Sequence, residues 1–372
     1  MKNIRIYEAD IHVTTVCSSC CEYCYIDQHG EARSRNLFKG CPKEGSVGVL
    51  MDVISSLRFN AGIKDLVFVG GDPCEHSSLV ELLIFSKSLG LNTVVLSNTH
   101  TYRSSGNVYC MSDIVSLIDE VDFTLHGWDA ESHDSFNHTP GSYDRAMRQI
   151  KRYMACRKDD QSVGIVLNMV PNTIEHLREI MEGAIKRLEL KPGQDFFTIQ
   201  RIAPVGKAAM EWDRWKITPE MMVIAFNVFD EIKSKYDIET KVTIDTLPWC
   251  IVPKKHRHYL EPLEGGCNWG KPDGVLSVLP DGRLQRCALC ANDLGVNILD
   301  IHSPEAFTEF MLNNPVLAAT RNREHLAERC LKCPLLEKCG GGCIIANTDG
   351  ISFGDPYKTS TPRQGVDYLL LR

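Results

Sequence analysis

The chain has 372 residues, of which 43% are hydrophobic and 24% are charged, a composition typical of globular proteins. This length suits one large α/β barrel or two domains. The net charge of −7 argues against a surface for nucleic acid or anionic membranes. No apolar run approaches the roughly 18 residues of a membrane-spanning helix, and the N-terminus lacks a signal-peptide core. We therefore expect a cytoplasmic protein with no nucleic-acid or membrane partner.

Short β-rich segments alternate with helical segments up to about residue 205. The predicted strands are 4–13, 65–71, 92–98, 121–127, 163–170 and 196–204, and the predicted helices between them are 46–59, 77–90, 112–120, 142–156 and 173–189. Strands that alternate with helices indicate βαβ units and a parallel sheet. Six units are too few for a closed eight-stranded barrel, so we expect an α/β fold with a partial (β/α)6 TIM-like barrel.

The pattern changes after one more amphipathic helix. This helix is predicted at 218–237, with Thr218 as its N-cap. Residues 273–287 then indicate a β-hairpin, 303–314 indicate a short helix, and the region ends in a cysteine-rich segment with loops. We expect a core domain at 1–240 and a cysteine-rich domain at 241–372.

Sixteen cysteines are the unusual feature of the composition. Because cytoplasmic thiols stay reduced, clustered cysteines are better interpreted as metal ligands than as disulfides. Cys17, Cys21 and Cys24 form C-x3-C-x2-C just after the first predicted strand. Three thiolates on one loop suit three irons of a [4Fe–4S] cluster and leave the fourth iron open. Zinc is the alternative, but a structural zinc site normally takes four ligands from two separated knuckles, and Cys20 has the wrong spacing.

These cysteines, followed by Tyr25, resemble the signature of radical S-adenosylmethionine (radical SAM) enzymes. The turn Gly70-Gly71-Asp72-Pro73, after the second predicted strand, resembles the family's Gly-Gly-Glu-Pro motif. The resemblance implies a catalytic [4Fe–4S] cluster held by the three cysteines, with S-adenosylmethionine bound to its open iron. It also implies that the cofactor is cleaved to a 5′-deoxyadenosyl radical, which abstracts a hydrogen atom from the substrate.

The resemblance covers about residues 8–210 and implies further contacts with the cofactor. Asp134 lies near an expected helix start, and Asn168 lies where members contact the ribose or carboxylate. Arg201 would either pair with a cofactor or substrate carboxylate or close the barrel through a salt bridge. The full implied set is Tyr23, Gly70, Gly71, Asp72, Pro73, Ser97, Asn98, Asp134, Asn168 and Arg201. The catalytic acid or base is unassigned, although three loop histidines are candidate proton shuttles: His126, His133 and His138.

The C-terminal cysteines resemble a SPASM domain, the auxiliary-cluster extension of radical SAM enzymes. Six cysteines match its spacing: Cys267, Cys287, Cys330, Cys333, Cys339 and Cys343. The resemblance implies that Cys267, Cys287 and Cys343 hold one auxiliary iron–sulfur cluster, and that Cys330, Cys333 and Cys339 hold a second. A zinc ribbon is the alternative.

The fourth ligands of these auxiliary clusters are open. No cysteine follows Cys343, so Asp349 or Asp355 could complete the second cluster, or the region holds one cluster only. Cys250 or Cys290 could complete the first cluster, or its fourth position could be open for a substrate group. We therefore expect one or two auxiliary clusters.

Enzymes with this extension usually modify ribosomally made peptides. The resemblance favours a maturase that forms an intramolecular thioether or carbon–carbon crosslink, with a flavodoxin- or ferredoxin-type electron donor. The chain starts at its first strand, so a leader peptide would bind elsewhere or through a separate protein. Ala288 occupies the position where sulfatase-maturing relatives carry a catalytic Asp. The alternatives are a sulfatase-maturing or small-molecule cofactor-biosynthesis oxidoreductase, and a non-catalytic electron-transfer or zinc-binding protein.

Overall fold

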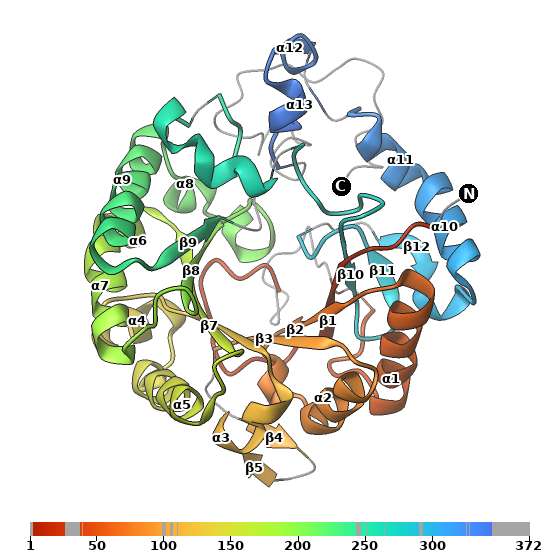
Figure 1. Ribbon diagram of the computed structural model, residues 1–372, viewed down its shortest axis with the longest axis horizontal. Coiled ribbons are helices and arrows are strands. Elements are labelled where there is room, and N and C mark those ends of the chain that lie inside the picture. The colour runs from red at the N-terminus through yellow and green to blue at the C-terminus, as the bar shows by residue number, and fades with distance from the viewer. Residues whose placement is uncertain are drawn as a thin grey trace.

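A curved ten-stranded sheet organises the computed structural model, and its helices lie along the outside (Figure 1). The structure describes residues 3–26, 38, 40–98, 102–104, 107–109, 111–242, 247–250, 252–263, 265–289, 293–324, 326 and 328–343. In this part of the chain, no helix is long and apolar enough to cross a membrane.

Six parallel strands form the barrel portion of the sheet. In spatial order they are β1 (Glu8–Thr14), β2 (Asp65–Gly70), β3 (Asn92–Ser97), β6 (Glu120–Thr124), β7 (Ser162–Met169) and β8 (Phe196–Arg201). Every neighbouring pair is parallel. The six predicted strands and the α/β partial-barrel fold are therefore confirmed.

The sheet continues beyond the six strands at both edges. β9 (Glu239–Val242) pairs in parallel with β8, and β10 (Val275–Val278) pairs in parallel with β1. β11 (Arg283–Gln285) and β12 (Asp293–Asn297) follow β10 in antiparallel order, which gives the predicted hairpin. A separate ribbon of β4 (Tyr102–Ser104) and β5 (Asn107–Tyr109) lies outside this sheet.

Helices cover the outer face of the barrel. The longer ones are α1 (Val47–Ser56) with the π-helical turn η1 (Leu57–Ala61), α2 (Leu79–Ser88), α5 (Ser142–Cys156), α7 (Leu177–Leu188) and α9 (Pro219–Tyr236). The shorter ones are η2 (Pro73–Glu75), α3 (Met111–Ile114), η3 (Val115–Leu117), α4 (Ala130–Asn137), α6 (Pro171–Glu175), η4 (Gly206–Ala209) and α8 (Trp212–Trp215). As predicted, the Thr218 hydroxyl caps α9, accepting the Met221 N–H at 3.3 Å.

Three elements differ from the predicted helices. The segment predicted as a helix at 112–120 forms only α3 and the 3-10 turn η3, and Glu120 already belongs to β6. The segment predicted as one helix at 173–189 is divided into α6 and α7, with His176 at the junction outside helical geometry. α4 was not predicted, because its sequence is mostly polar and shows little helical periodicity. The helix begins instead at a capping box, in which Asp129 and Ser132 bond to each other's backbone.

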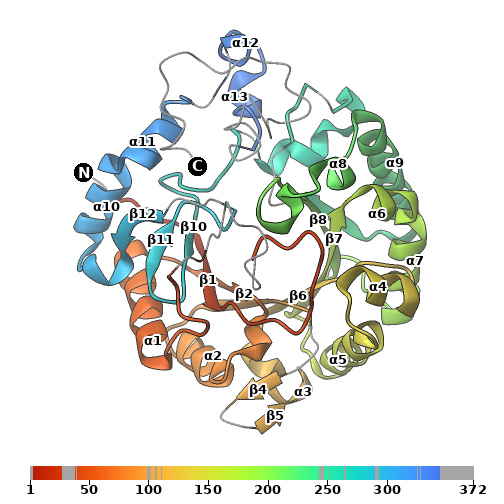
Figure 2. The ribbon, with the colours of Figure 1, turned by 180° about the vertical axis from the view of Figure 1, so that it is seen from behind.

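The region after β9 shares the barrel's hydrophobic core. It contains η5 (Lys254–Leu263), η6 (Ile298–Asp300), α10 (Pro304–Asn313), α11 (Pro315–Arg321), α12 (Glu328–Leu331) and α13 (Leu336–Cys339). Leu284 and Phe307 are fully buried in the same cluster as Val53 of α1. Figure 2 shows β10 beside β1, with α10 near α1. The boundary predicted near residue 240 falls inside β9, and it stays a prediction.

The two faces of β1 separate the core from the barrel interior. Ala9, Ile11 and Val13 are fully buried against the outer helices. Residues of the alternate face point to the opposite side because side chains alternate along a strand. Asp10 and His12 belong to this inner face, so β1 presents polar side chains to the interior of the barrel.

Candidate active site

Three cysteines of the first loop line a cavity at the carboxyl ends of the barrel strands. Cys17, Cys21 and Cys24 follow β1, and all three are among the residues that line this cavity. Cys20 is exposed and is not among the described residues that line it. The loop therefore presents to the cavity the three thiols of the C-x3-C-x2-C pattern.

Two glycines let the end of β2 lie against the segment that leads into this loop. A Cβ at Gly70 would lie 2.2 Å from the Thr14 carbonyl oxygen. A Cβ at Gly71 would lie 2.1 Å from the carbonyl oxygen of Val16. The N–H groups of Gly71 and Asp72 donate to carbonyl oxygens of that segment at 2.7 Å. Only glycine allows this approach, and the resulting bonds fix the chain that enters the cysteine loop.

The carboxylate of Asp72 joins the ends of β2 and β3. It accepts hydrogen bonds from the N–H groups of Cys74 and Asn98, both at 2.9 Å, and from the Ser97 hydroxyl at 2.8 Å. Burial raises the pKa of Asp72 to about 6, although these bonds oppose the shift. Among the described residues, neither Asp72 nor Pro73 lines the cavity. Asp72 instead positions Ser97 and Asn98, which do line it.

The sulfur of Cys17 receives two hydrogen-bond donors. The Ser19 N–H lies 3.4 Å from Cys17 Sγ, and Nδ2 of Asn98 lies 3.3 Å from it. Asn98 Nδ2 also donates to Ser19 Oγ at 3.2 Å, which holds the amide in place. Donors of this kind stabilise a thiolate, the form of cysteine that binds metal.

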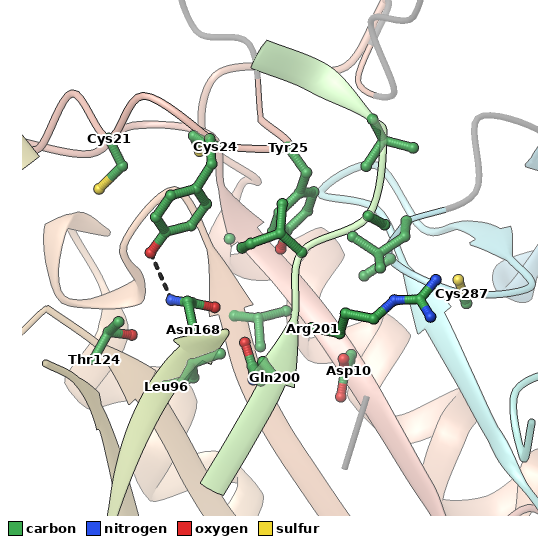
Figure 3. A pocket seen from close by; sticks show the side chains of 18 of the residues that line it. Asp10, Cys21, Cys24, Tyr25, Leu96, Thr124, Asn168, Gln200, Arg201 and Cys287 are labelled. Carbon is green, nitrogen blue, oxygen red and sulfur yellow. Dashed lines mark hydrogen bonds between the residues drawn. The ribbon is translucent and has the colours of Figure 1, made fainter. Parts of the chain in front are cut away.

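Tyr23, Asn168 and His126 form a hydrogen-bonded group on the cavity wall. Asn168 donates from Nδ2 to the Tyr23 hydroxyl at 2.5 Å (Figure 3). The Tyr23 hydroxyl lies 3.1 Å from His126 Nδ1, so its own hydrogen is directed to that nitrogen. His126 then carries its proton on Nε2, which lies 3.9 Å from Cys21 Sγ. The group links the end of β7 to the cysteine loop.

The segment after β8 packs on the last cysteine of the loop. A Cβ at Gly206 would lie 2.5 Å from the Cys24 carbonyl oxygen, which also accepts the Lys207 N–H at 3.0 Å. Arg201, at the end of β8, is buried and lines the cavity. Figure 3 shows its side chain extending from β8 toward Cys287.

The same cavity is lined by three cysteines of the C-terminal region: Cys267, Cys287 and Cys343. Cys287 and Cys343 are buried, and they form one hydrophobic cluster with Ala203 and Val205 from the segment after β8. Residues more than 240 positions apart in the chain therefore meet at one site. This arrangement groups the three cysteines that the sequence assigned to one auxiliary cluster.

The other predicted auxiliary ligands lie away from this cavity. Cys330 is in α12, Cys333 is in the next turn, and Cys339 ends α13; none of these described residues lines the cavity. Cys339 Sγ accepts the Trp249 N–H at 3.4 Å, so Cys250, the next residue, lies beside this group. Three further predicted ligands lie outside the described residues: Cys290, Asp349 and Asp355.

Asp134, a predicted cofactor contact, has a structural position instead. Its carboxylate accepts hydrogen bonds from the N–H groups of Gly141 and Tyr143 and from the Ser142 hydroxyl, at the start of α5. These bonds lower the pKa of Asp134 despite its partial burial. It is not among the described residues that line the cavity.

Of the three predicted proton shuttles, His126 alone lines the cavity within the described part of the chain. His133 is buried, which lowers its pKa to about 4, and its Nδ1 accepts the His126 N–H at 3.1 Å. His138 pairs with Glu22 at 2.9 Å and is half exposed. The structure thus gives His133 and His138 supporting contacts.

The chemistry of the cysteine loop fits an iron–sulfur cluster. Burial raises the pKa of the Cys17 and Cys21 thiols; the Asp72 carboxylate raises that of Cys17 further, and Cys24 raises that of Cys21. A bound cation offsets such costs by stabilising the thiolates. Among the described residues, no group of three or more His, Cys, Asp or Glu side chains is arranged as ligands of a single metal ion. The site is therefore identified by where these cysteines lie and by their spacing in the sequence, and not by a set of side chains already arranged as metal ligands.

Several cavity residues were not predicted from the sequence. Asp10, Gln200, Trp269 and Arg286 line the cavity together with the cysteines. Asp10 had one sequence signal, because it is a charged residue in the middle of a strand that is otherwise buried. Arg286 precedes a predicted ligand, but nothing in the local sequence indicates that it is fully buried.

A protein-family model matches the part of the chain that carries the cysteine loop. Residues 11–184 match the model of the Radical SAM superfamily. The chain carries a radical SAM domain. The matched residues contain the cysteine loop, the Gly70-Gly71 turn and the ends of β3, β6 and β7 that line the cavity. The domain implies a [4Fe–4S] cluster and S-adenosylmethionine.

Curated relatives of the radical SAM chain differ in their named activities. An AdoMet-dependent heme synthase of Oleidesulfovibrio alaskensis is 22% identical over 339 residues, covering 88% of this chain and 80% of that protein. A probable GTP 3′,8-cyclase of Saccharolobus islandicus is 25% identical over 298 residues, covering 78% and 85%.

Solved structures with a similar fold include peptide complexes. Streptococcus suis SuiB bound to S-adenosylmethionine has a TM-score of 0.66 at 14% identity, covering 92% of this chain and 73% of that one. SuiB bound to precursor peptide SuiA has a TM-score of 0.63 at 14% identity, covering 92% and 72%. An anSMEcpe structure with AdoMet and Cp18Cys peptide has a TM-score of 0.62 at 16% identity, covering 94% and 91%. These similarities show a shared fold.

Proposed function

We propose that this radical SAM enzyme is a maturase that modifies a ribosomally synthesised peptide with the help of a SPASM-like extension. One observation carries the proposal: the three cysteines of the radical SAM loop and three of the C-terminal region line the same cavity. A substrate in that cavity would lie between the catalytic cluster and an auxiliary cluster. A hydrogen atom could then be removed on one side and an electron on the other.

The residues of the chain hold and enclose the reacting groups. When bound, the cluster and S-adenosylmethionine supply one-electron chemistry that generates a 5′-deoxyadenosyl radical. Cys17, Cys21 and Cys24 would hold the cluster, and the other strand-end residues of the cavity would hold the cofactor: Gly70, Gly71, Ser97, Asn98 and Asn168. Tyr25, with the buried residues Ala203 and Val205, packs over this region and would exclude water.

The peptide substrate is supported by fold similarity to proteins solved with peptides. The most direct product would be an intramolecular thioether or carbon–carbon crosslink, as the resemblance to SPASM enzymes implies. Ala288 lines the cavity where sulfatase-maturing relatives carry an Asp, which disfavours that reaction.

The auxiliary region would hold one or two clusters. We assign Cys267, Cys287 and Cys343 to the cluster that faces the cavity. We assign Cys330, Cys333 and Cys339 to a second cluster. The sequence offered Cys250 for the first cluster; because the neighbouring Trp249 bonds to Cys339, we assign Cys250 to the second site instead.

A small-molecule substrate in cofactor biosynthesis is the second candidate. It is favoured by the curated relatives, which are named as a heme synthase and a GTP cyclase and align with most of this chain. The two candidates share the same radical chemistry and differ in what enters the cavity.

The first test is iron content after anaerobic reconstitution. We expect about four fewer irons per chain in the triple variant Cys17→Ala, Cys21→Ala, Cys24→Ala than in the wild type. The wild type should also form 5′-deoxyadenosine under a strong reductant, and the triple variant should not. Stoichiometric zinc with little iron, or no 5′-deoxyadenosine from the wild type, would exclude the enzyme proposal.

The second test uses a small peptide encoded beside the gene and co-expressed with the enzyme. A mass loss of two hydrogens supports a crosslink. An unchanged mass, together with 5′-deoxyadenosine formation, would contradict the crosslinking reaction while leaving the radical chemistry in place.

A further inference from the structure

Asp10 presents an unpaired carboxyl group to the active-site cavity. It lies on the inner face of β1, is 8% exposed, and lines the cavity with the six cysteines. The described residues provide no hydrogen bond or ion pair to its carboxyl group. A buried polar group without a partner costs free energy, so such groups usually have a ligand or a function.

The rest of the cavity favours an acceptor or an anion as that ligand. Arg201 and Arg286 line the same cavity, and Asp10 is the only carboxyl group among the described residues that do. Arg286 is 1% exposed, and its Nη1 donates to Thr320 Oγ1 at 2.9 Å, which anchors it to α11. Two guanidinium groups repel a cation and attract an anion.

The environment of Asp10 favours the protonated form of its carboxyl group. Burial raises its pKa well above the ordinary value, and the neighbouring Glu8 raises it further. A neutral carboxylic acid has an O–H that donates a hydrogen bond. Asp10 can therefore bind an anionic oxygen, which an ionised carboxylate would repel.

Asp10 lies apart from the cysteine loop and from the Asn168 contact. In Figure 3, Cys21, Cys24 and the Asn168 hydrogen bond occupy one side of the cavity, whereas Asp10, Cys287 and the end of the Arg201 side chain occupy the other. Predicted cofactor contacts lie at the ends of β2, β3, β7 and β8, and Arg201, from β8, extends its side chain to the Asp10 side (Figure 3). The Asp10 side of the cavity is therefore the half nearer to the C-terminal cysteines.

We propose that this half of the cavity binds a carboxylate of the substrate, which accepts a hydrogen bond from the Asp10 carboxyl group and lies beside the Arg201 guanidinium group. The proposal deepens the proposed function, since it rests on the same cavity receiving the substrate. Two sources supply this chemistry: an acidic side chain of a peptide, or a carboxylate of a small molecule. A hydrogen bond from an O–H group to a carboxylate oxygen is short and charge-assisted.

The test compares Asp10→Asn with Asp10→Leu in the reconstituted enzyme with S-adenosylmethionine present. In Asp10→Asn, the amide NH2 group replaces the O–H as a hydrogen-bond donor. In Asp10→Leu, the side chain has no hydrogen-bond donor. We expect Asp10→Asn to bind substrate within about threefold of the wild type, and Asp10→Leu to bind about ten- to a hundredfold more weakly. Asp213→Asn is the control for the same chemical change, because the Asp213 side chain is 90% exposed and does not line this cavity among the described residues, and it should bind as the wild type does.

Two probes separate the sources of the carboxylate. One is the peptide encoded beside the gene, with its acidic residues intact or each changed to the matching amide. The other is a porphyrin with propionate groups, compared with its methyl ester. Binding is measured by equilibrium dialysis, and circular dichroism verifies that each variant is folded. We expect one probe to bind the wild type and its amide or ester form to bind at least tenfold more weakly.

Three results would overturn the proposal. If Asp10→Asn binds as weakly as Asp10→Leu, an ionised carboxylate is required and the ligand is a cation. If Asp10→Leu binds as the wild type does, Asp10 has no role in binding. If neither probe binds the wild type, or the amide and ester bind equally well, no carboxylate is recognised. Formation of 5′-deoxyadenosine by the wild type shows separately whether the proposed radical chemistry holds.

Discussion

Arg157 and Asp195 show how single residues secure the barrel far from its active site. Arg157 follows α5 and binds Asp195 through both guanidinium nitrogens, and the two side chains are 1% and 0% exposed. Asp195 also accepts the N–H groups of Val163 and Lys191, at 3.1 and 2.8 Å. The pair therefore connects α5, the start of β7 and the loop that leads into β8.

Removing one partner of this pair should destabilise the protein strongly. Arg157→Met leaves the Asp195 charge buried without its cation, and we expect a loss of about 3–5 kcal/mol in the free energy of unfolding. Denaturant titration measures this change. Arg178→Met is the control, because Arg178 and Glu231 form an exposed pair and its loss should cost less than about 1 kcal/mol. Equal effects of the two variants would contradict the assigned role.

Asp122, on β6, makes stability depend on pH. Burial raises its pKa from 3.8 to about 8, Glu120 raises it further, and Lys241 opposes the shift. Below about pH 4, Asp122 is neutral in both the folded and unfolded states. Between about pH 4 and pH 8, the unfolded chain ionises while the folded protein keeps the proton, so the free energy of unfolding falls as pH rises.

Asp122→Asn removes this titration. We expect the variant to gain stability relative to the wild type as pH increases from about 5 to about 8. Denaturant titrations of both proteins at several pH values measure the difference. A stability difference that stays constant over this range would show that Asp122 is ionised in the folded protein.

At the scale of elements, Asp134 supplies the N-terminal cap that α5 lacks. The N-cap residue of α5 is Gly141, which has no side chain, and Asp134 of α4 reaches its N–H and that of Tyr143. We expect Asp134→Ala to lower the free energy of unfolding by about 1–2 kcal/mol, as loss of a helix cap does. The affinity for S-adenosylmethionine, measured by equilibrium dialysis, should not change. A weaker affinity with unchanged stability would instead support the cofactor contact predicted from the sequence.

The sequence predicts those elements whose signals are local. In the segments 65–71 and 142–156, apolar residues recur at the spacing of a strand and of a helix, respectively. The structure contains both elements. The cysteine loop was also found, because its ligands lie within eight residues. The role of Asp134 was not, since it depends on how α4 packs against α5. Asp10 was missed for the same reason, because the cavity forms only when strands far apart in the chain come together.

At the scale of the whole molecule, the C-terminal region completes the barrel's first strand. β1 bonds to β2 on one edge and to β10 on the other. Further links tie the N-terminal elements to α10 and η6: the Asn60 side chain donates to the Ile301 carbonyl oxygen at 2.6 Å, and the Ile4 N–H to the Thr308 hydroxyl at 2.9 Å. We therefore expect the radical SAM strands and the cysteine-rich region to unfold as one cooperative unit.

A fragment of residues 1–263 should not fold to the native state. It retains all six barrel strands and β9 but leaves β1 as an unpaired edge and uncovers the apolar face of α1. We expect aggregation, or a loosely packed state with far-UV but little near-UV circular dichroism.

In the full chain, Phe307→Ala should lower the free energy of unfolding by about 3–5 kcal/mol and reduce hydrogen-exchange protection in β1 as well as in α10. A fragment that unfolds cooperatively, or protection lost only in α10, would show that the core folds independently. The predicted boundary near residue 240 would then divide two separate domains.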